Sequence, residues 1–109
     1  MDALAHRRID IGNDHPAFAG HFPGQPILPG VALLAEVLEA AAADPVLSAL
    51  VGAPPQVSVV KFLAPVLPGA VLDIAFEAGA RSISFSVSEG GRLAASGQLA
   101  RRDAPPGAT

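Results

Sequence analysis

The chain has 109 residues, a formal net charge of −3 and no cysteine, and half of its residues are apolar while 16% are charged. This length predicts a single domain, residues 1–109, and the high apolar content predicts an oligomer. The scattered basic residues argue against nucleic acid, the missing cysteines exclude disulfides and thiolate chemistry, and no apolar run approaches the roughly 18 residues of a membrane span, so we expect a cytoplasmic protein.

The N-terminal part of the chain predicts a strand followed by a stiff loop. Residues 5–12 alternate weakly around Ile9 and Ile11, which is typical of an edge strand with its charged side toward water. Prolines and glycines then crowd the stretch up to Gly30, and prolines exclude both regular helix and central strand. We expect residues 1–4 and 102–109 to fray, since the tail has too little apolar surface to offset the entropy of ordering it.

A long helix is predicted next. From Val31 to about Ala43 nearly every residue is alanine, leucine, valine or glutamate, and Asp44-Pro45 ends the run before a short second helix over 45–51. Four apolar residues form a stripe at helical spacing: Val31, Leu34, Leu38 and Ala41. The rest of the circumference is also apolar, which is typical of a helix that is buried on all sides.

The second half of the chain changes to a period of two, which predicts strands over 57–62, 72–77, 81–88 and 93–101. The paired glycines in the sequence EGGR, residues 89–92, predict a tight hairpin between the last two. This order predicts the α+β class: a curled antiparallel sheet, with these four strands as a meander, wrapped around one long central helix. The sheet covers only one flank of the helix, so a second copy is expected to cover the other.

Two segments resemble the signatures of hotdog-fold 3-hydroxyacyl-acyl carrier protein dehydratases. Residues 20–31 read GHFPGQPILPGV, with a specific spacing of three prolines, three glycines and one histidine, and residues 60–70 read VKFLAPVLPGA, like the family's Lys/Arg-Phe strand and Pro-x-x-Pro-Gly turn. The resemblance spans residues 5–101. It implies a hotdog fold, a homodimer or dimer-based oligomer whose sheets join, and a tunnel between subunits for an acyl thioester on acyl carrier protein or coenzyme A. It implies no cofactor and no metal.

The chemistry that the resemblance implies is reversible loss of water from a 3-hydroxyacyl thioester in fatty-acid or related acyl-chain synthesis. This reaction needs a base at C2 and an acid for the departing hydroxyl, and His21 matches the family's catalytic histidine. Unpaired backbone amides where the helix begins would polarise the thioester carbonyl. We expect the substrate to contact residues from the loop, the helix and the strand over 57–62: Phe22, Gly30, Val31, Leu34 and Phe62.

The chain departs from the family at the catalytic carboxylate, because the position fourteen residues after the histidine is Ala35. Glu36 is the next residue, but one helical step rotates a side chain by about 100°. Glu39, one turn after Ala35, lies nearer the right face but deeper. Three interpretations stay open: Glu36 is the acid through a local shift of helix register, His21 acts with water or another group, or the activity is lost.

Two other functions stay open. A non-catalytic acyl-thioester-binding hotdog subunit is favoured by Ala35, and a hotdog thioesterase would use water activated by a carboxylate. His15 is expected in a turn and His6 at the surface, and no carboxylate at metal-ligand spacing joins the histidines, so no metal site is expected. Lys61 is expected on the solvent side of its strand.

Overall fold

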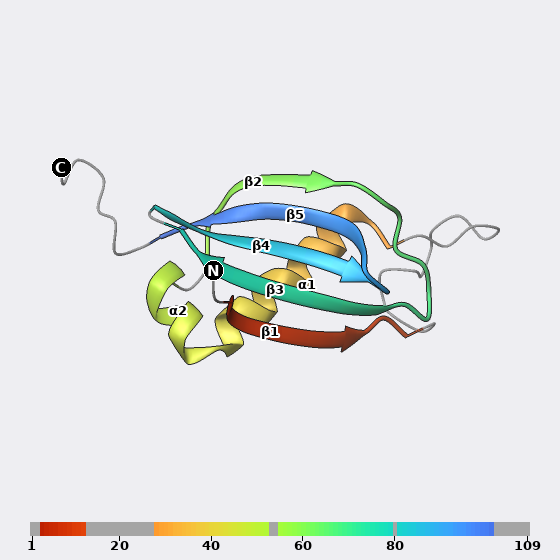
Figure 1. The fold of residues 1–109 in the computed structure, drawn as a ribbon, viewed down its shortest axis with the longest axis horizontal. Helices are drawn as coiled ribbons and strands as arrows, with labels where there is room; N and C mark the ends of the chain where they lie inside the picture. Colours follow the sequence, from red (N-terminus) through yellow and green to blue (C-terminus); the bar gives the residue numbers. More distant parts are fainter. Residues whose placement is uncertain (1–2, 13–27, 53–54, 80, 102–109) are drawn as a thin grey trace.

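The computed structural model describes residues 3–12, 28–52, 55–79 and 81–101. Its elements are, in chain order, β1 (Ala3–Asp10), α1 (Gly30–Ala43), α2 (Pro45–Val51), β2 (Val57–Phe62), β3 (Val71–Ala78), β4 (Ser82–Glu89) and β5 (Arg92–Ala100). The strands form one antiparallel sheet, and α1 crosses one face of it (Figure 1). The predicted α+β class, with one sheet packed on one central helix, is confirmed. None of the described helices is long and apolar enough to cross a membrane.

The order of the strands corrects one prediction. The order is β1-β3-β4-β5-β2, so β3, β4 and β5 form a meander, but β2 pairs with β5 at the far edge. The predicted four-strand meander was therefore wrong. The reason is the connection 63–70, which is too long for a hairpin and which two prolines stiffen. It crosses three strand spacings of about 4.8 Å each, well within its reach of about 26 Å, along one end of the sheet (Figure 1).

The face of the sheet that packs against α1 carries large apolar side chains. Leu72, Ile74 and Phe76 alternate along β3 and are fully buried, and Phe76 lies opposite Phe85 of β4. Along β4, half-buried serines alternate with the buried residues Ile83, Phe85 and Val87. The predicted period of two in these strands is confirmed. The hairpin between β4 and β5 is confirmed too, because its two glycines have φ of 58° and 84°, which primed turns require.

Only one face of α1 is buried within a single chain. The buried residues are Leu33, Val37, Ala40 and Ala41. Of the four residues in the apolar stripe, Ala41 is buried, Leu34 and Leu38 are half-buried and Val31 is 79% exposed. In a single chain the sheet covers one flank of α1, as expected, so burial of the other flank by a second copy stays a prediction. The opposite side of the helix, which includes Ala35, is exposed.

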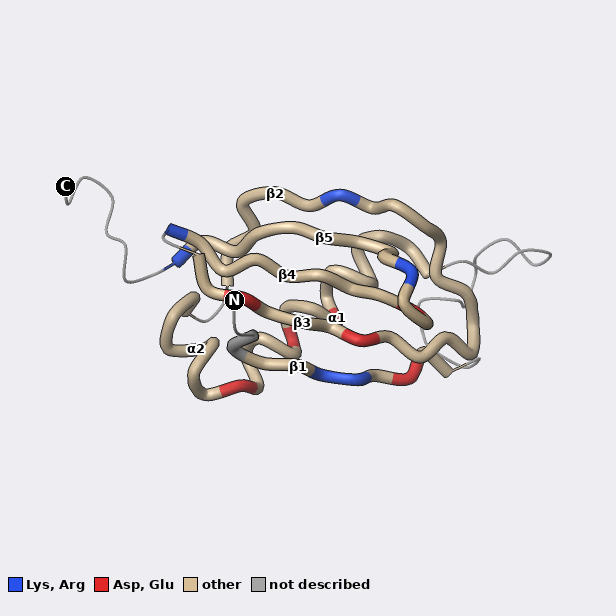
Figure 2. The backbone as a smooth tube through the Cα atoms, in the orientation of Figure 1, with Lys and Arg blue, Asp and Glu red and all other residues tan. Residues whose placement is uncertain are grey.

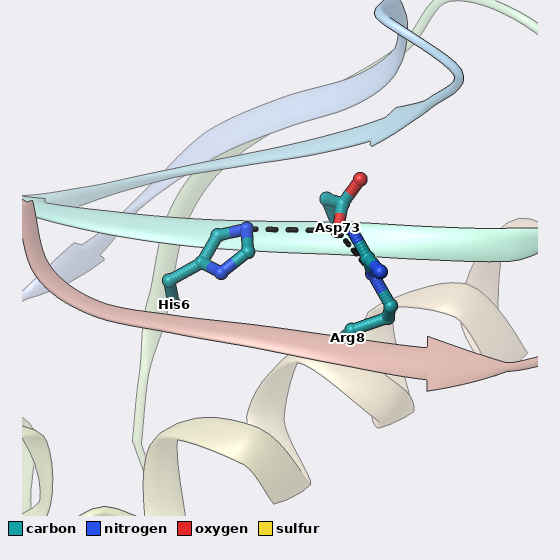
Figure 3. Close-up of polar contacts among 3 residues, drawn as sticks. All are labelled: His6, Arg8 and Asp73. Atoms are coloured by element: carbon teal, nitrogen blue, oxygen red, sulfur yellow. Dashed lines mark hydrogen bonds and ion pairs between the residues drawn. The ribbon is translucent and has the colours of Figure 1, made fainter.

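The edge strand β1 is confirmed, and its outward side chains are charged. Figure 3 shows His6 and Arg8 of β1 reaching the carboxylate of Asp73 on β3, with His6 Nε2 3.6 Å and Arg8 Nε 3.0 Å from Asp73 Oδ1. His6 is largely exposed, as predicted, and exposed pairs of this kind contribute at most about 1 kcal/mol. Charges along an edge strand oppose pairing with another sheet. Figure 2 shows this basic stretch on β1 and a shorter one on β2.

Candidate functional site

A pocket of about 400 Å³ opens where α1 begins, between the helix, the end of β2 and the connection 63–70. Its lining residues are all apolar: Leu28, Gly30, Leu33, Phe62, Leu63, Ala64, Pro65 and Val66. The floor consists of Leu28, Leu33 and Val66, which belong to the buried core. The ring of Phe62 and the side chain of Leu63 form the mouth. Phe62 is 50% exposed, and Leu63 is 54% exposed. Such a lining suits an apolar ligand.

Backbone hydrogen bonds hold the pocket at the end of the sheet where β2 leaves it. The amide of Leu28 donates to the carbonyl of Val66 at 2.8 Å, and the amide of Ile11 donates to the carbonyl of Ala70, also at 2.8 Å. Both acceptors lie in the connection between β2 and β3. The described residues on each side of segment 13–27 are therefore fixed at the pocket end of the sheet.

The start of α1 offers backbone donors at the edge of the pocket. The N-cap of α1 is Pro29, which makes no side-chain capping hydrogen bond. The carbonyl of Pro29 accepts from the amides of Ala32 and Leu33 at 3.0 Å each. Among the described residues, no acceptor pairs with the amides of Gly30 and Val31. The first amides of a helix are partially positive and free of intrahelical partners, so they attract an oxygen that gains negative charge.

Gly30 and Phe62, two predicted substrate-binding residues, are in direct contact. A Cβ atom at Gly30 would lie 2.9 Å from Cζ, 3.0 Å from Cε2 and 3.2 Å from Cε1 of the Phe62 ring. Real Cβ atoms do not approach this closely, so the ring lies over a position where only glycine fits without movement. The contact joins the first residue of α1 to the last residue of β2.

The other predicted binding residues of α1 lie beside the pocket instead of lining it. Val31 follows Gly30 and projects into solvent in the single chain. Leu34 is half-buried and packs against the core cluster. The sequence reasoning missed Leu28 and the residues 63–66, which form most of the lining. The Pro-x-x-Pro-Gly motif was the available signal, but it was interpreted only as a turn.

The predicted base, His21, and its neighbour Phe22 lie outside the described residues. The predicted acid lies on α1, which is continuous from Gly30 to Ala43, so Ala35 and Glu36 keep the rotation of about 100° that separates successive residues. Ala35 is exposed, opposite the buried face, and Glu36 is half-buried on the flank. Glu39 is exposed. A catalytic role for Glu36 stays a prediction.

Among the described residues, no charged side chain lines the apolar pocket. A second hollow, of about 460 Å³, is lined by Lys61 and by polar residues of β4 and β5 such as Ser84, Ser96 and Gln98. Lys61 is exposed, as expected for the solvent side of β2. Arg101 follows the far end of β5 and donates from Nη1 to the carbonyl of Gly79 at 2.8 Å. Within the described part of the chain, no three His, Asp or Glu side chains gather as a metal site.

A match to a protein-family model shows the family of this chain. A model of the ApeI-like family, described as ApeI dehydratase, matches residues 2–98. The chain belongs to the ApeI-like dehydratase family. Among curated proteins, this ApeI-like chain is similar to the 3-hydroxyacyl-[acyl-carrier-protein] dehydratase FabZ of two Anaeromyxobacter dehalogenans strains, with 45% identity over 42 residues. That match covers 35% of this chain and 27% of the length of those relatives.

Solved structures agree with the family. An uncharacterized protein from Erwinia carotovora subsp. atroseptica is 30% identical, with a TM-score of 0.69 over 93% of the ApeI-like chain and 90% of its own. A chain of the dehydratase heterocomplex ApeI:P from Xenorhabdus doucetiae is 23% identical, with a TM-score of 0.65 over 92% of this chain and 96% of its own, which shows the shared fold. The predicted resemblance to hotdog dehydratases and the predicted hotdog fold are both confirmed.

Proposed function

We propose that the chain is a 3-hydroxyacyl thioester dehydratase that acts in the cytoplasm on an acyl-acyl carrier protein or acyl-coenzyme A, in fatty-acid or related acyl-chain synthesis. The observation that carries the proposal is the apolar pocket at the amide-rich start of α1, in a chain of a dehydratase family. The reaction removes the proton from C2 and breaks the C3–O bond, so that water leaves and a C2–C3 double bond forms. The acyl carbons occupy the pocket in this proposal.

The amides of Gly30 and Val31 stabilise the charge that develops during proton removal. As the C2 proton leaves, negative charge grows on the thioester oxygen, and donors fixed in advance at the start of a helix meet this charge without rearrangement. One such donor is worth roughly 10²–10³ in rate.

His21 is the proposed base, and Glu36 the proposed acid. Support for His21 comes from its place in the matched motif and from the chain on both sides of its segment, which is hydrogen-bonded at the pocket end of the sheet. Glu36 is the nearest carboxylate in sequence to the family position at Ala35. Because α1 shows no shift of register, we expect Glu36 to be a less effective acid than a carboxylate at position 35.

A second hotdog subunit completes the site in this proposal, with a homodimer as the simplest form. In the described sheet β2 pairs on one side with β5, and its residues Val59 and Phe62 are exposed apolar side chains. Val31 and Ala35 of α1 are also exposed apolar residues. The solved ApeI:P dehydratase from Xenorhabdus doucetiae is a heterocomplex, which supports a paired assembly and makes a non-identical partner the alternative.

A second candidate function is a non-catalytic acyl-thioester-binding subunit, and Ala35 is the observation that favours it. A hotdog chain without a carboxylate at this position keeps the apolar pocket and the helix amides, which suffice for binding. Loss of the general acid would lower the reaction rate by a factor of roughly 10²–10⁴. In a heterocomplex such a chain would hold the acyl group while its partner supplies the acid.

The test of the proposed function is an assay of the purified chain with crotonyl-coenzyme A and crotonyl-acyl carrier protein. We expect loss of enoyl absorbance without release of thiol, because water adds across the double bond in the reverse direction of dehydration. Thiol release in a thiol-detection assay would instead identify a thioesterase. Binding with neither reaction would support the non-catalytic alternative and contradict the dehydratase.

A further inference from the structure

The outer face of the sheet, opposite α1, carries two neighbouring rows of side chains near the β2 edge. In the first row Lys61 of β2 lies opposite Ser96 of β5. In the second row Val59 lies opposite Gln98, and Ser84 of β4 follows on the other side of Gln98. Residues two apart on a strand share a face, so both rows project away from α1 and from the apolar pocket. The hollow of about 460 Å³ lies over these rows.

The base of this hollow is apolar. Gly97 of β5 has no side chain, and a Cβ atom there would overlap the carbonyl oxygen of Val59 and lie 2.7 Å from Cζ of Phe85. The glycine therefore lets the Phe85 ring pack directly against the backbone of β5. Phe85 lines the hollow and is 3% exposed, whereas the other lining residues are half-buried or exposed. An apolar base with a few polar groups at the rim is typical of small-molecule sites.

The polar groups of the rim are available to a ligand. Within the described part of the chain, the side chains of Lys61, Ser96 and Gln98 make no hydrogen bond or ion pair. The hydroxyl of Ser84 donates to the carbonyl of Glu77 at 3.4 Å, which is longer than an ordinary O–H···O bond. Lys61 is the one charged residue among the described lining residues. The rim therefore offers an ammonium group, hydroxyls and a carboxamide.

The distribution of charge favours an anion at one end of the hollow. Lys61 and Ser96 face each other across β2 and β5, so an ammonium group and a hydroxyl are both within reach of one bound group. Glu77 lies opposite Ser84 at the other end, and its carboxylate repels an anion from there. Lysine, serine and glutamine side chains are common ligands of phosphate oxygens. The hollow is larger than one phosphate group, and Val59 adds apolar surface for the rest of a ligand.

We propose that this hollow binds a small phosphate ester, with the phosphate held by Lys61 and Ser96 and the organic part over Val59 and the apolar base. The site lies on the opposite face of the sheet from the apolar pocket and does not depend on the proposed dehydratase activity. A second subunit paired with β2 would leave the site open, because strands pair through main-chain groups and the outer side chains keep their direction.

Amide NMR spectra of the full chain, recorded during titration with adenosine 5′-monophosphate, inorganic phosphate or adenosine, test the site. We expect the monophosphate to shift the amide signals of Lys61 and residues 96–98 with a Kd of the order of 1 mM. Inorganic phosphate should shift the same signals at least about threefold more weakly, and adenosine should not shift them. Equal affinities for the two phosphates would contradict an ester site, and shifts confined to Gly30 and Val31 would assign the anion to the start of α1 instead.

Charge variants separate a site from general attraction of anions. Lys61→Gln should weaken binding of the monophosphate by about tenfold or more, and Ser96→Ala by about threefold, because charge-assisted hydrogen bonds are lost. Arg92→Gln is the matched control, since it removes the same charge from an exposed position of β5 outside the hollow, and affinity should stay within about twofold. Equal weakening by Lys61→Gln and Arg92→Gln would overturn the proposal. Thermal unfolding of each variant shows that the fold is retained.

Discussion

His21→Ala is expected to lower kcat/KM for hydration of a crotonyl thioester by about 100-fold or more. The imidazole is the proposed base, and a positioned acid or base contributes roughly 10²–10⁴ in rate. The measurement is loss of enoyl absorbance with crotonyl-coenzyme A or crotonyl-acyl carrier protein. Affinity for an unreactive amide analogue of this thioester should change by less than about threefold, because the pocket floor and the helix amides stay in place.

The matched control for this substitution is His15→Ala. His15 belongs to the same segment but stands outside the motif shared with the dehydratases, so its removal should leave kcat/KM within about twofold. An equal loss in both variants, with lowered thermal stability, would point to damage of the segment instead of removal of a base. Full turnover by His21→Ala would contradict the proposed chemistry.

Ala35→Glu is expected to raise the hydration rate by at least about tenfold. The substitution puts a carboxylate where the related dehydratases carry one, and a well-placed acid is worth roughly 10²–10⁴. The cost to stability is small, because Ala35 is exposed on the side of α1 away from the core and glutamate is a good helix former. The measurement is the same absorbance assay, with the thermal midpoint of each variant alongside.

Three further variants identify the source of any gain. Ala35→Gln has nearly the same shape but cannot donate a carboxyl proton, and Ala42→Glu adds the same charge at another exposed position of α1. Neither should raise the rate. Glu36→Gln should lower the wild-type rate and leave most of the gain in the Ala35→Glu background. A rate in Ala35→Glu no higher than in Ala35→Gln would show that position 35 does not face the reacting hydroxyl.

Local features of the fold could be predicted from the sequence because local chemistry determines them. The paired glycines supplied the positive φ angles of the hairpin, and Asp44-Pro45 separated the two helices at the predicted place. Asp44 also caps α2, since its carboxylate accepts from the amides of Val46 and Leu47 at 2.9 and 3.0 Å. These signals act within a few residues of the chain.

The position of β2 could not be predicted in the same way. Alternation says that a segment is a strand, but it does not say which strand lies beside it, and the burial along β2 does not alternate. The partner, β5, is distant in sequence, and the crossing depends on the connection 63–70. The sequence also did not indicate which face of α1 is buried. An apolar residue occupies nearly every position of the helix, so Leu33 and Leu34 look equivalent in sequence.

Part of the candidate site followed from the motifs, and part required the fold. The motifs named Gly30 and Phe62, but the contact between the ring and the glycine joins two segments whose approach depends on sheet topology. The floor residues Leu28 and Val66 meet through a backbone hydrogen bond between the loop end and the β2–β3 connection. Nothing in the spacing of either segment indicates that pairing.

In the proposed complex, the apolar pocket at the start of α1 holds the acyl group, with the carbonyl at the helix amides and the imidazole of His21 at C2. A crystal structure of the chain with the amide analogue of a 3-hydroxybutyryl thioester would show whether the substrate binds in this way. We expect the carbonyl oxygen within about 3.1 Å of the Gly30 or Val31 amide nitrogen and the His21 ring within hydrogen-bonding reach of the C2 side. An analogue bound elsewhere, or a His21 ring directed into bulk solvent, would contradict the proposal.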